Sequence, residues 1–381
     1  MIAAPAACQQ VTLASLKLTD FRNYKAVGCD LRPGLVVLTG RNGSGKTNLL
    51  EAVSFLSPGR GLRRAKLGSV ARTDGAGGWA VAADIAAGED VRRVGTGLRS
   101  AEEASREVRV DGATAPSSEA LSEYCRVLWL TPAMDGLFTG APGDRRRFLD
   151  RLSLAIDPGH GSRVRAFDRL ISSRNRLLED DAGPRWLSAV EAELAEAALA
   201  VSLARQETVA LLAGLIASHD ETSAFPSAGL ALEGDFEAEL VAGRSASEAE
   251  EAYRAALASE RGRDRAAKRT LSGPHRSDLA VTFAAKNAPA ALSSTGEQKA
   301  LLLAIILAEA ELVARVAGMT PILLLDEVAA HLDEGRRAAL LARLEALGGQ
   351  SFLTGTDKAL FSAVNDSGQF IEVVDGQLSV A

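Results

Sequence analysis

The chain has 381 residues, of which 47% are hydrophobic, and a formal net charge of −6. This length exceeds one typical domain, and the apolar content can supply a sizeable core, so we expect two lobes or more. The negative charge excludes a molecule that attracts DNA over its whole surface, so any DNA site must be a local basic patch.

Targeting signals are absent from the places where they would be expected. The first ten residues have no basic segment before an apolar core, which disfavours a secretory signal. The apolar run after Lys299 is too short to span a bilayer. The three cysteines, Cys8, Cys29 and Cys125, form no CxxC pair and are typical of a reducing compartment. We therefore expect a cytoplasmic protein.

The first part of the chain, as far as residue 131, has the pattern of short strands. Short apolar runs are separated by turn residues, and the pair Asp111 and Gly112 marks a turn between two of them. The expected strands cover residues 11–18, 35–38, 79–85, 91–98, 108–110 and 127–130.

A phosphate-binding P-loop follows the second of these strands. Every required position of the motif is filled by Gly40, Arg41, Asn42, Gly43, Ser44, Gly45, Lys46 and Thr47. Residues 48–53 continue as a helix, whose N-terminus and backbone N–H groups attract phosphate. Lys46 can reach the β- and γ-phosphates, and the Thr47 hydroxyl can bind Mg²⁺. A chance glycine-rich turn is disfavoured because strand, octet and helix occur together. The motif predicts binding of ATP with Mg²⁺.

A basic cluster comes shortly after the P-loop helix. It contains no interleaved acid and consists of Arg60, Arg63, Arg64 and Lys66. It is the best electrostatic candidate for a DNA-binding patch, and a simply solvated face is the alternative. Two other arginine clusters, at residues 145–151 and 261–269, are weaker candidates because they include acids.

The middle of the chain predicts helices. Apolar residues recur at alternating steps of three and four, which is typical of a coiled-coil seam: Leu187, Val190, Leu194, Ala197, Val201, Ala204, Thr208, Leu211 and Leu215. A preceding helix near 164–178 can pack antiparallel to it across the break at 181–184. A sheet pattern resumes at Leu279, Val281 and Phe283. We therefore expect an α/β ATPase head, formed by residues 1–142 and 271–381, that is split by a helical, coiled-coil-like lobe at 143–270.

A second possible anion site precedes a long apolar helix at 299–316. Small and polar residues gather at this helix N-terminus: Ser293, Ser294, Thr295, Gly296, Glu297 and Gln298. A helix N-terminus attracts phosphate. Because one subunit already has a P-loop, this segment is most simply used on a nucleotide held by another subunit. Ordinary helix capping is the alternative.

An acidic pair ends the apolar run at 321–325. Such a run predicts a central parallel strand, and ligands of open α/β sheets gather at the carboxyl ends of their strands. Asp326 is expected to hold Mg²⁺, and Glu327 to act as the general base that orients a water toward the γ-phosphate. A strand that merely ends in a solvated acidic turn is the alternative.

The order of P-loop, signature segment and acidic strand resembles that of ABC-type ATPases, whose two subunits enclose two ATP molecules. Ser294, Thr295 and Gly296 match the signature serine and its two small neighbours, with threonine where many relatives have glycine. The helical insertion narrows the resemblance to the SMC proteins, the Rad50 group and the RecF family. Among these, several short sequence segments most closely resemble the RecF family. They are Phe21–Tyr24, GRNGSGKTNLLEAVSFLSPGRGLR from Gly40, Pro142–Asp150, Gly273–Arg276 and Val328–Asp333.

The resemblance to the RecF family implies a function. Its members are expected to be weak DNA-dependent ATPases that form a homodimer with ATP. They bind double-stranded or gapped DNA and single/double-strand junctions, and act with RecR and RecO to help RecA replace single-strand binding protein. An ATPase subunit of a transporter and an ATP-gated scaffold with incidental hydrolysis are the alternatives.

The resemblance also implies roles for single residues. Asp333 matches the D-loop aspartate. Arg22 resembles an arginine that approaches the nucleotide phosphates in related heads, and an ordinary exposed turn arginine is the alternative. Thr354 and Thr356 stand where many ABC ATPases have a switch histidine, and one or the other is expected to contact the γ-phosphate side. Residues 131–135 occupy the Q-loop place without a glutamine. His275 and Arg276 receive no chemical role, and the histidines and cysteines suggest no zinc site.

Overall fold

The computed structural model describes residues 8–219, 224–241, 245–364 and 368–380, with only the backbone of Ala330 and His331. Within these residues the chain forms two compact units. The P-loop unit comprises Met1–Asp135, Asp220–Phe225 and Thr295–Ala381, and the helical unit comprises Gly136–His219 and Pro226–Ser294. The helical unit begins at Gly136 and continues through Ser294, whereas the expected lobe covered residues 143–270.

The first sheet of the P-loop unit is antiparallel throughout. In spatial order it contains β2 (Tyr24–Asp30), β1 (Val11–Phe21), β4 (Trp79–Ala87), β5 (Asp90–Leu98), β6 (Glu107–Val110) and β7 (Ala113–Thr114). Buried residues alternate with more exposed ones along most of β4, as expected for a sheet with one face on the core. At its end, the rings of Phe21, Phe55 and Trp79 pack against one another.

The second sheet carries the P-loop and is mainly parallel. Its spatial order is β15 (Gln377–Val380), β14 (Gln369–Val374), β3 (Leu35–Thr39), β13 (Ser351–Gly355), β12 (Ile322–Leu325) and β8 (Val127–Leu130). Only β15 pairs antiparallel to its neighbour among these described strands. Strands β8, β12 and β13 are buried along their whole length, as is typical of parallel strands covered on both faces. The sheet confirms the expected parallel strand before Asp326.

The helices of the P-loop unit are α1 (Lys46–Ser54), α8 (Thr295–Ala317) and α9 (Glu334–Leu347). Helix α1 contacts β1 of the first sheet and β8 and β13 of the second, so the helix after the P-loop lies between the two sheets. Helix α8 begins four residues earlier than expected. Thr295, Gly296, Glu297 and Gln298 therefore form its first turn instead of preceding it.

Short 3₁₀ segments complete the two units. Those of the P-loop unit are η1 (Leu67–Val70), η2 (Ser118–Glu123), η3 (Pro132–Met134), η6 (Val328–His331) and η7 (Lys358–Phe361). Those of the helical unit are η4 (Ala284–Lys286) and η5 (Ala290–Leu292).

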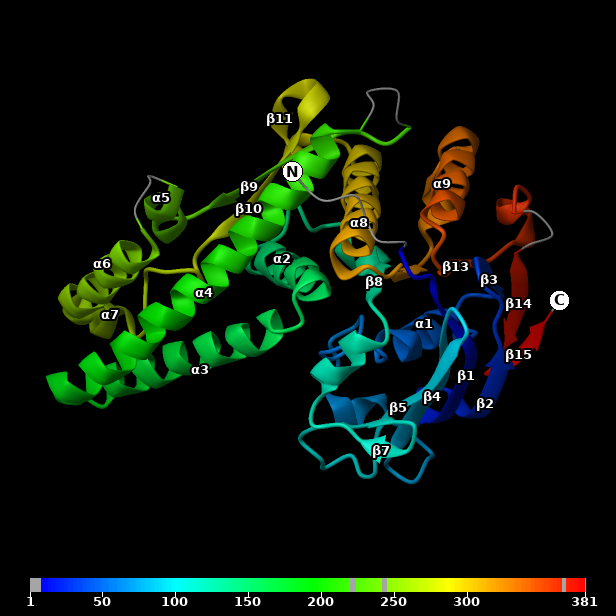
Figure 1. Cartoon of the computed structure of the whole chain (residues 1–381), viewed down its shortest axis with the longest axis horizontal. Helices are drawn as coiled ribbons and strands as arrows, with labels where there is room; N and C mark the ends of the chain where they lie inside the picture. Colours follow the sequence, from blue (N-terminus) through cyan, green and yellow to red (C-terminus); the bar gives the residue numbers. More distant parts are fainter. Residues whose placement is uncertain (1–7, 220–223, 242–244, 365–367, 381) are drawn as a thin grey trace. The chain divides into compact units, whose positions relative to one another are not determined.

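The helical unit is built around a hairpin of two long helices (Figure 1). Its helices are α2 (Pro142–Ile156), α3 (His160–Glu179), α4 (Pro184–Ala217), α5 (Asp235–Val241), α6 (Ala246–Ser259) and α7 (Arg261–Ala267). Pro184 stands at the first turn of α4, where its missing N–H costs no helical bond. The hairpin across residues 180–183 confirms the expected antiparallel pair.

The buried face of α4 differs in part from the expected seam. Leu187, Leu194, Val201, Thr208 and Leu215 are buried, at every seventh position, as expected. The second line of buried residues is instead Glu191, Ala198, Arg205 and Leu212, one residue beyond the expected line. This helix is also the only described one that is long and apolar enough to cross a membrane by length and composition. In this unit it packs against α3 and α6.

A small antiparallel sheet also belongs to the helical unit. Its strands, in spatial order, are β11 (Ala288–Pro289), β10 (Asp278–Phe283) and β9 (Ala228–Glu233). The strand pattern at Leu279–Phe283 was expected in the ATPase head. It pairs instead with β9, inside the segment that was expected to be entirely helical.

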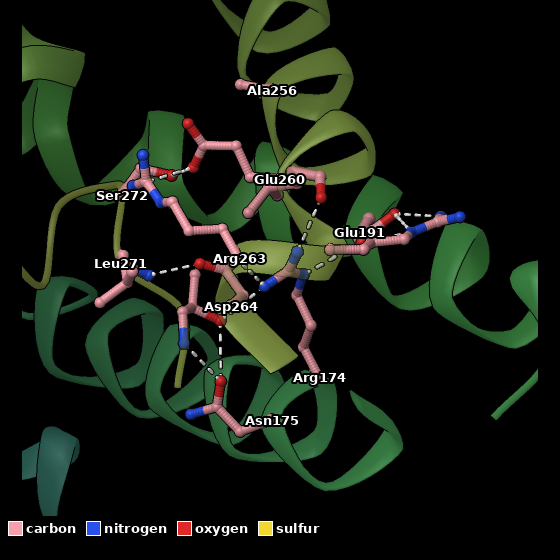
Figure 2. Close-up of polar contacts among 12 residues, drawn as sticks. Arg174, Asn175, Glu191, Ala256, Glu260, Arg263, Asp264, Leu271 and Ser272 are labelled. Carbon is pink, nitrogen blue, oxygen red and sulfur yellow. Dashed lines mark hydrogen bonds and ion pairs between the residues drawn. The ribbon is translucent and has the colours of Figure 1, made fainter. Parts of the chain in front are cut away.

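A buried charged network joins the helices near the turn of the hairpin (Figure 2). Arg174 of α3 is fully buried and donates to Glu191 of α4, to Asp264 of α7 and to the carbonyl of Leu257. It also donates to the Thr270 hydroxyl at 2.8 Å. Arg261 pairs with the same Glu191. Because every one of these charges has a partner, the network can stay buried.

Candidate nucleotide-binding site

The P-loop connects β3 to α1 in a conformation that requires glycine. Gly40, Gly43 and Gly45 have φ values of +146°, +81° and +118°. A Cβ at Gly40 would lie 2.3 Å from the carbonyl oxygen of Val373. A Cβ at Gly45 would lie 2.6 Å from Asn23 Nδ2. The glycines therefore allow both the backbone turn and the close approach of neighbouring segments.

Lys46 folds back over this loop. Its ammonium donates to the carbonyls of Gly40 at 2.7 Å and Arg41 at 3.0 Å, and only 5% of the residue is exposed. Burial lowers the pKa of Lys46, and the carboxylates of Glu327 and Asp326 oppose that shift. A cation held over the loop, with both carboxylates close enough to act on it, is suited to exchange carbonyl oxygens for phosphate oxygens.

Thr47 and Asp326 come together at the carboxyl edge of the sheet. The Thr47 hydroxyl lies 2.9 Å from Asp326 Oδ2 and 3.1 Å from Oδ1. Hydroxyl and carboxylate oxygens are the ligands Mg²⁺ prefers, and Mg²⁺ in such sites takes one or two carboxylates together with substrate phosphates. The two residues fit a magnesium site. No group of three or more histidine, cysteine or acidic side chains suited to a metal occurs among the described residues.

Glu327 has an unusual backbone conformation. Its φ of +55° lies in the left-handed region, which is uncommon for residues other than glycine and is often found at functional sites. Its N–H donates to the hydroxyl of Thr354 at 2.8 Å. The left-handed residue turns the chain out of β12 directly into η6.

The two threonines expected near the γ-phosphate differ in position. Thr354 lies on β13 and is 1% exposed, and its hydroxyl donates to Asp326 Oδ1 at 2.8 Å. Its single hydroxyl hydrogen is therefore used on Asp326. Thr356 is exposed beyond the end of β13. A contact between one of these threonines and the γ-phosphate stays a prediction. The exposed Thr356 is better placed for it than the buried Thr354.

The turn between β1 and β2 supports the P-loop, a role that sequence reasoning did not assign to Asn23 or Tyr24. Asn23 Nδ2 donates to the carbonyl of Ser44 at 3.2 Å, and the Tyr24 hydroxyl donates to that of Gly45 at 2.9 Å. Arg22 binds the buried carboxylate of Glu51 on α1 through two nitrogens, at 2.7 and 2.8 Å. Its expected approach to the phosphates stays a prediction, and in this structure its guanidinium braces the P-loop helix.

The basic cluster is exposed but not wholly free of acids. Arg60, Arg63, Arg64 and Lys66 all have exposed side chains. Arg63 donates to Glu51 at 2.8 Å and to Asn48 at 2.6 Å. Glu51 is distant enough in sequence to be missed when the cluster is read as a linear run. In the helical unit, arginines of the two weaker clusters are paired in the same manner, including Arg145 with Asp278 and Arg265 with Asp181.

The residues expected to contact the second subunit's nucleotide lie at the beginnings of helices. Ser294 directly precedes α8, whose first turn contains the rest of the signature segment. Asp333 caps α9 by accepting from the N–H of Arg336 at 2.8 Å. Lys299 of α8 pairs with Asp135, at the end of the segment in the Q-loop place, at 2.9 Å. Their contact with a nucleotide of a second subunit stays a prediction.

Comparison with known proteins extends over nearly the whole chain. The family model described as the RecF/RecN/SMC N terminal domain matches residues 12–377. The DNA replication and repair protein RecF of Mesorhizobium japonicum is 54% identical over 369 residues, which cover 96% of this chain and 97% of the relative. The protein of the same name from Rhizobium johnstonii is 52% identical over 371 residues, covering 97% and 99%.

Solved structures show the same fold at lower identity. A structure described as the recombination mediator protein RecF-ATP in the RecFOR pathway has a TM-score of 0.83 and 23% identity, covering 98% of this chain and 100% of the other. The Smc head domain from Pyrococcus furiosus, bound to the C-terminal domain of ScpA, has a TM-score of 0.54 and 17% identity, covering 97% and 96%. These likenesses confirm the expected α/β head of the ABC and SMC type with an inserted helical region.

Proposed function

Because this chain belongs to the RecF family of DNA replication and repair proteins, we propose that it is a cytoplasmic, ATP-operated recombination mediator. ATP binding closes a homodimer on double-stranded DNA at gaps or single/double-strand junctions. With RecR and RecO, the closed dimer promotes loading of RecA. Hydrolysis of ATP to ADP and phosphate then reopens it.

The observation that carries this proposal is the cluster of Thr47, Asp326, Glu327 and Thr354 beside the P-loop. It brings a hydroxyl of the P-loop helix and two acids of a parallel strand to one sheet edge, where α/β proteins bind their ligands. The backbone N–H groups of the P-loop and the Lys46 ammonium bind the phosphates. Thr47 and Asp326 would hold Mg²⁺, which would neutralise charge on the phosphates. Glu327 accepts the proton of the attacking water.

Closure of the dimer follows from sharing of the nucleotide. Each ATP contacts the P-loop of one chain and the signature segment of the other, Ser294–Gln298, with Asp333 at the same interface. A ligand that binds the closed state more tightly than the open one shifts the population toward closure. After hydrolysis the partner's helix N-terminus loses the γ-phosphate it was holding. A solved relative described as RecF-ATP supports nucleotide binding in this fold.

DNA binding is assigned to a local patch because the whole chain has a net charge of −6. The exposed side chains of Arg60, Arg64 and Lys66 are the proposed DNA contacts. Arg63 adds positive charge to the same patch while it remains paired with Glu51. Similarity to RecF proteins over 96% and 97% of the chain supports DNA over a membrane partner.

Sedimentation of the chain with a gapped DNA duplex, with and without ATP, tests the proposal. We expect two copies per DNA with ATP and a largely dissociated mixture without nucleotide or with Lys46→Met. ATP turnover should rise with gapped DNA and not with phospholipid vesicles. A chain that stays monomeric with ATP, or that binds DNA equally with and without ATP, would contradict the proposed clamp.

A further inference from the structure

The hydroxyl of Thr354 stands between the two acids of the site. It donates to Asp326 Oδ1 and accepts from the N–H of Glu327, both at 2.8 Å. The parallel register of β12 and β13 explains this position, because Leu325 pairs with Leu353 and the next residues of the two strands are therefore Asp326 and Thr354. One buried side chain thus serves two consecutive residues of the neighbouring strand.

These two bonds use the hydroxyl as both donor and acceptor. A threonine hydroxyl has one hydrogen, which here is directed to Asp326, so it is not available to a phosphate oxygen at the same time. The effect of Thr354 on a nucleotide must therefore act through Asp326 and Glu327.

Each bond also solves a local problem of the chain. The N–H of Asp326 still takes part in the sheet, donating to the carbonyl of Leu130, but the N–H of Glu327 lies beyond the end of β12. Thr354 supplies the acceptor there and helps to hold a left-handed backbone that is strained for a residue other than glycine. On the other side, Thr354 and Thr47 both donate to Asp326, which fixes the orientation of its carboxylate.

We propose that Thr354 is a positioning residue. Its one hydroxyl orients both the Asp326 carboxylate that would bind Mg²⁺ and the Glu327 residue that would activate the water. The inference rests on the proposed ATPase function. Thr354 stands where many ABC ATPases have the switch histidine, and here its role is to orient these two acids and not to contact phosphate directly. A partner in the second layer of a metal site is typically worth about 10- to 100-fold in metal affinity or activity.

Thr354→Val removes the hydroxyl with little change in shape, and Thr354→Ser keeps it. With the metal chelated, nucleotide affinity of both variants should stay within about 3-fold of the unaltered chain, because the P-loop is untouched. In Thr354→Val, Mn²⁺ affinity of the ADP complex, measured by electron paramagnetic resonance, should fall about 10- to 100-fold, and kcat should fall by a similar factor. Thr354→Ser should recover most of both losses.

Thr320→Val is the matched control. Thr320 is also buried, and its hydroxyl accepts a backbone N–H from Val11 at 3.0 Å, but it lies before the opposite end of β12. It should leave Mn²⁺ affinity and kcat unchanged. If Thr354→Val is poorly folded by circular dichroism, Thr354→Ala provides a second variant without the hydroxyl.

The Mn²⁺ measurement separates this inference from the proposed function. An unaltered chain that binds Mn²⁺–ADP but never hydrolyses ATP would contradict the proposed ATPase, while the Mn²⁺ affinities would still test Thr354. A hydroxyl-free variant with unaltered Mn²⁺ affinity would overturn the inference. So would a Thr354→Ser variant that lost as much affinity as Thr354→Val.

Discussion

Arg63 of the basic cluster donates to the buried carboxylate of Glu51 on the P-loop helix at 2.8 Å. Arg22 binds both oxygens of the same carboxylate, so one acid of α1 holds two arginines. Arg63 therefore supports the P-loop helix, whereas the exposed side chains of Arg60, Arg64 and Lys66 are the proposed DNA contacts.

The first prediction concerns DNA. Replacing Arg60, Arg64 and Lys66 by alanine should weaken DNA binding similarly for unrelated sequences. It should also flatten the dependence of log K on log salt by roughly one unit per lost phosphate contact. Fluorescence anisotropy of labelled DNA over a range of salt measures both effects.

Arg63→Ala serves as the contrasting variant. It should reduce thermal stability and ATP affinity even without DNA, because Glu51 is buried and keeps only Arg22. If the triple variant keeps the salt slope of the unaltered chain, the patch is not the DNA site.

The second prediction separates binding from hydrolysis. Lys46→Met should abolish the ATP-dependent dimer, because it removes the cation that offsets the β- and γ-phosphates. Glu327→Gln should keep ATP binding and prolong the dimer, since loss of a general base costs about 10²- to 10⁴-fold in rate. Single-turnover hydrolysis and sedimentation measure the two properties. Hydrolysis by Glu327→Gln at the unaltered rate would show that another group is the base, and a functional Glu327→Gln chain in cells would favour the scaffold alternative.

The third prediction tests sharing of the site. Ser294→Arg should block the γ-phosphate of the partner's nucleotide while sparing nucleotide binding by its own P-loop. Lys46→Met should do the reverse. In a symmetric dimer, a mixture of the two inactive variants contains heterodimers with one doubly altered site and one native site. Some ATPase activity should therefore return on mixing.

Crosslinking controls for heterodimer formation in that experiment. Each variant alone, at the same total concentration, gives the baseline. Crosslinked heterodimers that hold ATP in the intact site but recover no hydrolysis would count against a shared site.

The fourth prediction concerns the support of the P-loop by the preceding turn. Gly45→Ala places a methyl group 2.6 Å from Asn23 Nδ2 and 2.8 Å from the Tyr24 hydroxyl, at a φ of +118°. The strained backbone alone costs about 1–3 kcal/mol, and the turn must also move. We expect loss of ATP binding by isothermal titration calorimetry.

Gly214→Ala is the matched control, because Gly214 lies within α4 and a Cβ there meets nothing within 4 Å. It should leave ATP binding intact and raise stability by about 0.5–1 kcal/mol. Equal ATP affinity of Gly45→Ala and the unaltered chain would mean that the β1–β2 turn does not constrain the loop.

The sequence predicted those parts of the site that are continuous in the chain. The P-loop octet and the apolar run that ends at Asp326 can each be recognised from consecutive residues alone. The contact between Thr354 and Asp326 could not be predicted, because it depends on the register of β13 against β12. The ion pair between Arg63 and Glu51 could not be predicted for a similar reason. It depends on a turn that brings the cluster back to α1, and that turn has no periodic sequence pattern.

The fold was predictable to the same extent. The α3–α4 hairpin was correctly predicted from apolar spacing, but one line of the buried face of α4 was placed a residue too early. Counting apolar residues misses Glu191 and Arg205, which are buried because they form ion pairs. The pairing of β9 with β10 joins segments about fifty residues apart, which short-range patterns do not reveal.

The Arg174 network has a mechanical consequence for the helical unit. The helix ends beside the turn of a two-helix hairpin ordinarily fray, because the last residues of the first helix and the first residues of the second have few neighbours. Here Arg174 and Glu191, a few residues from the turn on either side, are fastened to α7 and to Thr270, and the chain runs on from Thr270 into β10. The helix ends beside the turn, α7 and the segment at Thr270 therefore share one set of ion pairs and hydrogen bonds, so loss of the Arg174 guanidinium would loosen all of them at once.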